Sequence, residues 1–188
     1  MVNLGKINPQ PQRICAIDAS TNSLAFAIFD GTKLVACGKI NFEGNKIFSK
    51  VRDASRKTGE LLKNFAIDAI VIEHTVFLNS PKTMNDLAMV QGALIGSSGI
   101  TRVKTINPIA WQTFIGNGKL NKDMKLSLRA ENPGKSESWY KAYEREFRKQ
   151  KTIKFVNINY DKNISDNDVA DAIGIGHYAI NNWQKLGD

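Results

Sequence analysis

Residues 14–40 read ICAIDASTNSLAFAIFDGTKLVACGKI, and this stretch decides the fold. It contains three runs rich in Ile, Ala, Phe and Val (14–20, 24–29 and 34–40), a composition typical of β-strands. The polar turn Thr21-Asn22-Ser23 separates the first two runs, and Asp30-Gly31 predicts a tight hairpin turn into the third. The stretch therefore predicts three consecutive strands joined as hairpins.

The next hundred residues alternate between helical and strand patterns. Apolar residues recur at roughly helical spacing over 46–65, and the apolar run 69–72 then predicts a strand covered on both faces. Ser80-Pro81 opens a second helix, because Pro suits the first helical position, and we expect Gly96 and Gly99 to close it. Residues 102–106 predict a fifth strand.

The last third of the chain is helical. Asn107-Pro108 caps a short helix, residues 136–151 predict a charged helix, and Ser165 is the expected N-cap of a final helix that runs through Trp183. The whole order predicts an α/β fold. Its mixed five-stranded sheet has three antiparallel strands and then two parallel ones, with helices on both faces.

Length and composition indicate one domain. The chain has 188 residues, 42% of them hydrophobic, which is enough for a substantial core. Residues 1–12 are polar, contain Pro9 and Pro11, and predict a flexible lead-in to a single domain over 13–188. No run approaches the roughly 20 apolar residues of a membrane span, so we expect no membrane association and a cytoplasmic location. Cys15 and Cys37 lack the spacing of a zinc site.

The basic charge is concentrated in one segment. The net charge is +8, and residues 119–154 contain eleven Lys or Arg against five Asp or Glu, a surplus of six. We expect a basic helical insertion around 119–163 in the domain. Such a surplus favours a polyanionic partner, although many basic proteins bind none.

Four acids stand out from apolar surroundings. Asp18 interrupts the first strand and Glu73 ends the fourth, while Asp168 and Asp171 share one face of the last helix. Carboxylates brought together in a core repel one another unless cations lie among them. The set could therefore supply the oxygen ligands of divalent metal ions that hydrolyse a phosphodiester. Taken singly, each acid is explained as well by a turn, a salt bridge or a helix macrodipole.

The order of these motifs resembles the RuvC family of Holliday junction resolvases, and its divergent bacteriophage members in particular. The resemblance is carried by Ile17-Asp18-Ala19-Ser20, by Ile70-Val71-Ile72-Glu73, by Met89-Val90-Gln91-Gly92, and by Asp168-Val169-Ala170-Asp171-Ala172 with the Ile-Gly-Ile-Gly run after it. It covers most of residues 14–179. The resemblance implies a ribonuclease H-like fold and a crossover junction endodeoxyribonuclease.

The same resemblance implies a site and partners. Asp18, Glu73, Asp168 and Asp171 would be catalytic and would bind two Mg²⁺ ions, for which Mn²⁺ could substitute. The substrates would be four-way junctions and other branched DNA, and the protein would act as a homodimer, because a two-fold protein suits a two-fold substrate.

Five further residues are predicted to contact DNA. Phe77 lies in the loop after Glu73, where an aromatic side chain could wedge between bases or simply pack. Lys82 follows on the next helix. Lys119, Lys122 and Lys125 recur every three residues and could line one face beside the catalytic cleft.

The sequence leaves rival functions open. Trp139, Tyr143 and Phe147 on the charged helix favour a lid or an interface over base stacking. A sugar-kinase or chaperone-type ATPase would need a second phosphate loop that the chain lacks. The nearer alternatives are cleavage of RNA–DNA hybrids by a ribonuclease H-type enzyme and a branched-DNA binding protein without catalysis.

Overall fold

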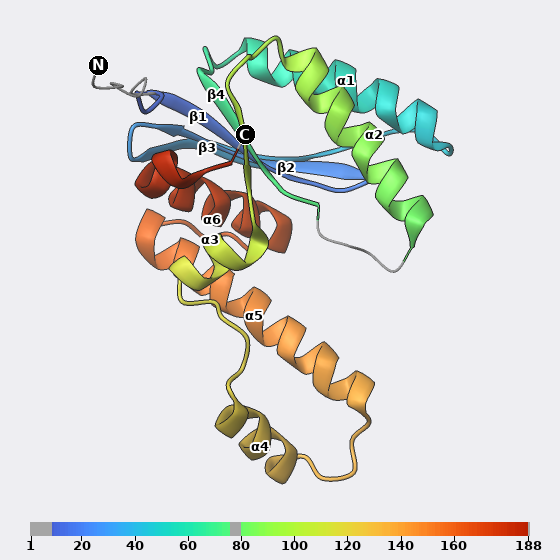
Figure 1. Ribbon diagram of the computed structural model, residues 1–188, viewed down its shortest axis with the longest axis vertical. Helices are drawn as coiled ribbons and strands as arrows, with labels where there is room; N and C mark the ends of the chain where they lie inside the picture. Colours follow the sequence, from blue (N-terminus) through green and yellow to red (C-terminus); the bar gives the residue numbers. More distant parts are fainter. Residues whose placement is uncertain (1–8, 76–79, 188) are drawn as a thin grey trace, which may run out of the picture.

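The computed structural model describes residues 9–75 and 80–187, and its centre is a five-stranded sheet (Figure 1). The strands are β1 Arg13–Ala19, β2 Ser23–Asp30, β3 Lys33–Asn41, β4 Ala69–Glu73 and β5 Val103–Ile106, in the order β3-β2-β1-β4-β5. The first three pair antiparallel, and β4 and β5 add parallel to β1. The predicted mixed sheet is confirmed. Gly31, with φ +57°, forms the predicted hairpin turn after β2.

Successive side chains of the strands bury themselves on opposite faces of the sheet, as the two-residue period requires. On one face Cys15, Ile17 and Leu24 pack under α1 (Ile47–Lys63) and α2 (Pro81–Ser98). On the other face Ile14 and Ala16 pack under α6 (Asn167–Asn182). The sheet is therefore the middle layer of three (Figure 1).

Helix ends differ in three places from the sequence-based expectation. The N-cap of α6 is Asp166, whose carboxylate accepts from the amides of Asp168 and Val169, so Ser165 is not the cap. Gly96 lies inside α2, which ends at Gly99 in the left-handed conformation. The charged helix, α5, runs over Glu137–Tyr160 and is longer than expected, because its last turns pack on α6. None of the helices within the described residues has the length and apolarity needed to span a bilayer.

Three further helices lie between β5 and α6: α3 Pro108–Phe114, α4 Lys122–Glu131 and α5. The C-terminal half of α5 packs on α6, while its N-terminal half projects away from the sheet and pairs with α4 (Figure 1). We call α4 and this projecting half of α5 the helical arm. Its own small core consists of Leu120, Leu128 and Tyr140, with Trp139 and Phe147 packed against them. Trp139 and Phe147 on α5 therefore serve packing within the arm, whereas Tyr143 is exposed.

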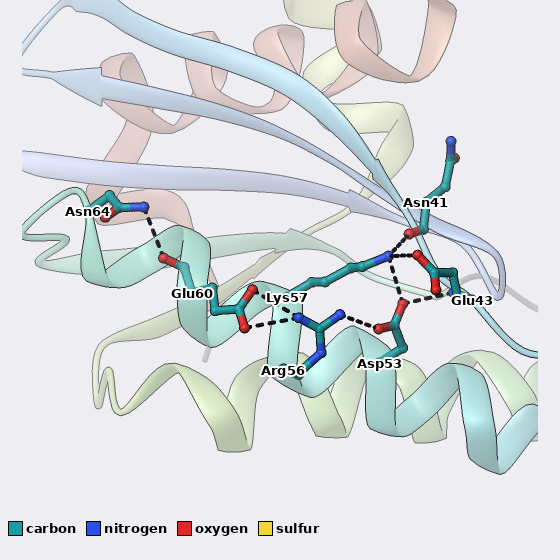
Figure 2. A network of polar contacts seen from close by, with 7 residues as sticks. All are labelled: Asn41, Glu43, Asp53, Arg56, Lys57, Glu60 and Asn64. Atoms are coloured by element: carbon teal, nitrogen blue, oxygen red, sulfur yellow. Dashed lines mark hydrogen bonds and ion pairs between the residues drawn. The ribbon is translucent and has the colours of Figure 1, made fainter.

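A polar network fixes α1 to the end of β3 (Figure 2). Lys57 donates to the Asn41 carbonyl at 2.9 Å and pairs with Glu43 and Asp53, both also at 2.9 Å. Asp53 accepts from the Glu43 amide at 2.8 Å. These bonds hold the pKa of Asp53 well below its usual range. The network lies on the far side of the sheet from α6 and is structural.

α6 approaches the sheet closely at Gly176, and we predict that Gly176→Ala destabilises the protein. A Cβ there would lie 2.2 Å from the Phe29 ring and 3.1 Å from Ala16 Cβ, and Phe29 is fully buried. Overpacking of this kind costs about 1–3 kcal/mol. For a domain of this size, the melting temperature should fall by about 2–4 °C per kcal/mol.

Gly96→Ala is the matched control for Gly176→Ala. It lies inside α2, where nothing is within 4 Å of an added Cβ, so Ala should raise or maintain the melting temperature. Equal melting temperatures for the two variants would show that the packing of α6 on the sheet does not require glycine at position 176.

Candidate active site

Asp18 and Glu73 lie side by side at the carboxyl ends of neighbouring parallel strands. Ile17 on β1 is in register with Ile72 on β4, so the next residue of each strand is an acid. Alternation along the strands places Asp18 with Ile14 and Ala16, and Glu73 with Ala69 and Val71, on the face that α6 covers. Both side chains are partly buried between the sheet and that helix.

The first turns of α6 bring Asp168 and Asp171 to the same place. The two residues are three apart and so share one side of the helix. The helix packs on the sheet through the neighbouring Val169, Ala170 and Ala172, which are buried. The structure thus gathers the four acids predicted from the sequence between two strand ends and one helix.

The electrostatics of these acids are those of crowded like charges. Burial, then the neighbouring Asp168, raises the pKa of Asp18 to about 6. Burial, then Asp18, raises the pKa of Asp171 to about 7. Burial, then Asp18, raises the pKa of Glu73 to about 8, against a hydrogen bond from Trp111 that lowers it. The folded chain therefore lacks enough positive charge to stabilise all these carboxylates in their ionised form.

A side-chain amide from α2 contacts both the end of β4 and Thr75 just after it. The Gln91 amide donates to the Glu73 carbonyl at 3.3 Å and its oxygen accepts from the Thr75 hydroxyl at 2.9 Å. On the other side Trp111 Nε1 donates to Glu73 Oε1 at 3.4 Å. Asp18, Glu73 and Gln91 also line an open cavity together with Ala19, His74, Thr75, Leu87 and Pro108. The two strand-end acids therefore face accessible space.

Lys39 on β3 is a site residue that the sequence did not reveal. Ala25 is in register with both Asp18 and Lys39, so Lys39 lies two strands from Asp18 in the same cross-strand row. Its Nζ contacts Asp168 Oδ2 at 2.5 Å and Asp166 Oδ2 at 3.3 Å. Only the strand register, which sequence reasoning did not extend to β3, could have placed this cation at the acids.

The four acids as they stand do not have the arrangement of a metal centre. Across residues 9–75 and 80–187, no three Asp, Glu, His or Cys side chains are positioned to hold a metal ion as they stand. Asp168 is instead engaged by Lys39. A bound ion would have to release Asp168 from Lys39 and draw the carboxylates together.

The predicted DNA-binding lysines lie away from this cluster. Lys122 and Lys125 are on α4, at the outer end of the helical arm, and Lys119 is in the loop that leads to it (Figure 1). Their predicted position beside the cleft is therefore wrong, because the arm carries α4 away from the sheet. Lys125 pairs with Glu144 at 3.5 Å, and Lys82 on α2 pairs with Asp86 at 2.8 Å. Whether these lysines contact DNA stays a prediction, and Phe77 lies outside the described residues.

A different set of cations does adjoin the acids. Arg145, Arg148 and Lys149 of α5 line a cavity that also includes Asp168 and Asp171. The sequence predicts only that the helix carrying these three residues is a lid or an interface element. Their position follows from the packing of α5 on α6, for which the sequence gives no local signal.

Comparison with known proteins identifies one relative in sequence and several in fold. No protein-family model matches the chain. The crossover junction endodeoxyribonuclease RuvC of Campylobacter jejuni is 28% identical over 86 residues, which are 44% of this chain and 54% of that protein. The matched segment thus spans about half the length of the curated relative.

Solved structures match over almost the whole chain. RuvC of Thermus thermophilus in complex with a Holliday junction substrate has a TM-score of 0.65 at 12% identity, covering 90% of this chain and 96% of that one. The yeast mitochondrial Holliday junction resolvase Ydc2 has a TM-score of 0.55 at 12% identity, covering 96% and 82%. The chain therefore has the fold of the RuvC-like resolvases, and the ribonuclease H-like fold predicted from the sequence is confirmed.

Proposed function

On this fold, we propose that the chain is a structure-selective endodeoxyribonuclease that resolves Holliday junctions and other branched DNA. The observation that carries the proposal is the convergence of Asp18 and Glu73, at two parallel strand ends, with Asp168 and Asp171 on α6. Like charges are buried together in this part of the molecule. A phosphodiester nuclease needs such a set because its metal ions and its substrate supply the balancing charges.

We infer that the four carboxylates hold divalent cations, in the cell Mg²⁺, with two ions as the expected number. All the donors are oxygens, which Mg²⁺ and Mn²⁺ prefer, and the raised pKa values indicate that the carboxylates would gain from a nearby cation. When bound, such ions act as Lewis acids and lower the pKa of a bound water. Trp111 and Gln91 would keep Glu73 in place while the substrate binds.

A homodimer is part of the same proposal. A four-way junction has two equivalent strands to cut, so two copies related by a two-fold axis would place one carboxylate cluster at each strand. The RuvC of T. thermophilus was solved with a Holliday junction, which supports this class of substrate for a chain of the same fold. Paired, symmetric nicks are the signature expected.

The test of the proposed function uses three substrates in parallel: a synthetic four-way junction, the linear duplex of the same sequence, and an RNA–DNA hybrid, each with Mg²⁺ or with EDTA. We expect metal-dependent paired nicks in the junction and little cleavage of the duplex. Cleavage of the hybrid alone would reassign the chain to the ribonuclease H activity. Tight junction binding without cleavage would leave a branched-DNA binding protein.

Lys39 gives a prediction about metal affinity that does not depend on activity. Because its ammonium group engages Asp168, it competes with a cation for that carboxylate. The Asp168 side chain is 45% exposed, so we value the contact at about 1 kcal/mol. Lys39→Gln should therefore bind Mn²⁺ about fivefold more tightly in isothermal titration calorimetry.

The control for Lys39→Gln is Lys33→Gln, at the opposite end of β3. Lys33 is exposed and lies by the β2–β3 turn. Its substitution removes the same charge far from Asp168, so the Mn²⁺ affinity should stay that of the unmodified protein. Unchanged or weaker binding by Lys39→Gln would mean that Lys39 does not compete with the metal.

A further inference from the structure

A second cavity opens beside the carboxylates, on the side of α5. Its volume is about 260 Å³, and it is lined by Gln112, Asn117, Arg145, Arg148, Lys149, Thr152, Asp168 and Asp171. The cavity at Asp18 and Glu73 shares none of these residues. The four acids therefore lie between two cavities, one bordered by α2 and β4 and one by α5, and the second is basic.

The cations of the second cavity are not neutralised by salt bridges among the described residues. Among the described residues, neither Arg145 nor Lys149 forms a salt bridge, and Arg148 donates to the neutral Gln112 side chain. Arg148 Nε is buried and has no hydrogen-bond partner within the described part of the chain. Two other cations of the arm, Lys125 and Arg129, do pair with glutamates of α5.

The floor of this cavity is preorganised. Asn117 donates to the Thr152 hydroxyl at 2.7 Å, and the two residues are 3% and 1% exposed. Asn117 Oδ1 has no partner among the described residues. Residues 145, 148 and 149 are spaced by three and four, so one side of α5 presents all three cations toward α6. The planar guanidinium of Arg148, which is hydrogen-bonded to Gln112, suits the oxygens of a phosphate.

We propose that this cavity binds a backbone phosphate of the DNA strand that is cut, close to the phosphate that reaches the carboxylates. The inference rests on the proposed function and names the part of the chain that positions the substrate strand. Arg145 and Arg148 donate to the non-bridging oxygens, and Lys149 adds a charge beside Asp171. Since an anion next to four acids would be repelled, cations on the acids should strengthen its binding.

The experiment measures DNA affinity without cleavage, with the four-way junction in Ca²⁺ and a set of junctions that carry one neutral methylphosphonate at each position around the cut. In the unmodified protein, one position beside the scissile phosphate should weaken binding about tenfold. Arg145→Ala should weaken binding by a similar factor and lower the salt slope by about 0.9, the value for one phosphate contact. In that variant, the methylphosphonate at the same position should have no further effect.

Two further variants keep this test decisive. Arg52→Ala, an exposed arginine on α1, is the matched loss of one charge and should keep the methylphosphonate pattern of the unmodified protein. In Arg148→Gln, as in Arg145→Ala, the methylphosphonate at the position beside the scissile phosphate should have no further effect. If Arg148→Gln fails to fold, Arg145→Ala still tests the proposal, because Arg145 is exposed. A pattern unchanged in Arg145→Ala, in a protein that binds and cuts junctions, would overturn this inference alone. Failure of the unmodified protein to bind or cut branched DNA would overturn the proposed function as well.

Discussion

Asp18→Asn should abolish metal-dependent junction cleavage, with a loss of at least about a thousandfold in the single-turnover rate. Asp18 lies at the centre of the cluster, since its charge raises the pKa of both Glu73 and Asp171. As a ligand, Asp18 would help to hold metal ions whose Lewis-acid stabilisation is worth several kcal/mol, and each 1.4 kcal/mol is about a factor of ten in rate. Asn keeps the shape of the side chain and removes the charge, so the fold should survive.

The controls for this loss separate chemistry from binding. Junction affinity in Ca²⁺ should fall far less than the cleavage rate for Asp18→Asn, because the proposed phosphate contacts lie on other residues. Asp161→Asn is the matched substitution: Asp161 is exposed at the C-cap of α5 in the left-handed conformation, which Asn adopts readily, and it should cleave normally. If Asp18→Asn retained more than about a tenth of the rate, the four-carboxylate mechanism would be refuted.

The sequence predicted the acids because each acid violates a short-range pattern. Asp18 stands in an apolar strand, Glu73 ends one, and Asp168 and Asp171 are polar positions on a buried helix, so each departure is visible within one element. Their convergence follows from parallel pairing of β1 with β4 and from α6 on one face, which the order of elements already implies.

The cations of the site escaped prediction because their positions depend on long-range packing. Lys39 becomes a neighbour of Asp168 through the register of three strands. Arg145 and Arg148 reach α6 only because α5 extends to Tyr160 and its last turns join the main core. The lysine repeat over 119–125 looked suited to the cleft, but α4 packs on the far half of α5. A charge pattern within a helix predicts which side of the helix is charged, but it does not predict which element that side will contact.

The metal-free protein should lose thermal stability as the pH rises from about 5 to about 8, and Mn²⁺ or Mg²⁺ should restore it. The pKa values of Asp18, Asp171 and Glu73 are raised to about 6, 7 and 8, whereas in the unfolded chain these carboxyls return to about 4. Between these limits the folded state holds more protons than the unfolded state, so the free energy of unfolding falls as the pH rises. The stabilising protonated form is complete below about pH 4.

The size of this effect follows from the same shifts. One unit of pKa corresponds to about 1.4 kcal/mol, and because the three acids repel one another their contributions overlap, so we expect a total of a few kcal/mol. In EDTA the melting temperature should therefore fall by about 5–10 °C across this range. A divalent ion binds only the deprotonated cluster, so its stabilisation should grow with pH.

Asp18→Asn turns this prediction into a test of the site itself. Removing the central charge should raise the melting temperature of the metal-free protein at about pH 8, flatten its pH dependence and reduce the effect of metal. The substitution that ends cleavage should thus stabilise the fold, as expected where function requires like charges to be buried together. Equal pH dependence of the melting temperature in EDTA for the variant and the unmodified protein would show that the repulsion among these acids does not limit stability.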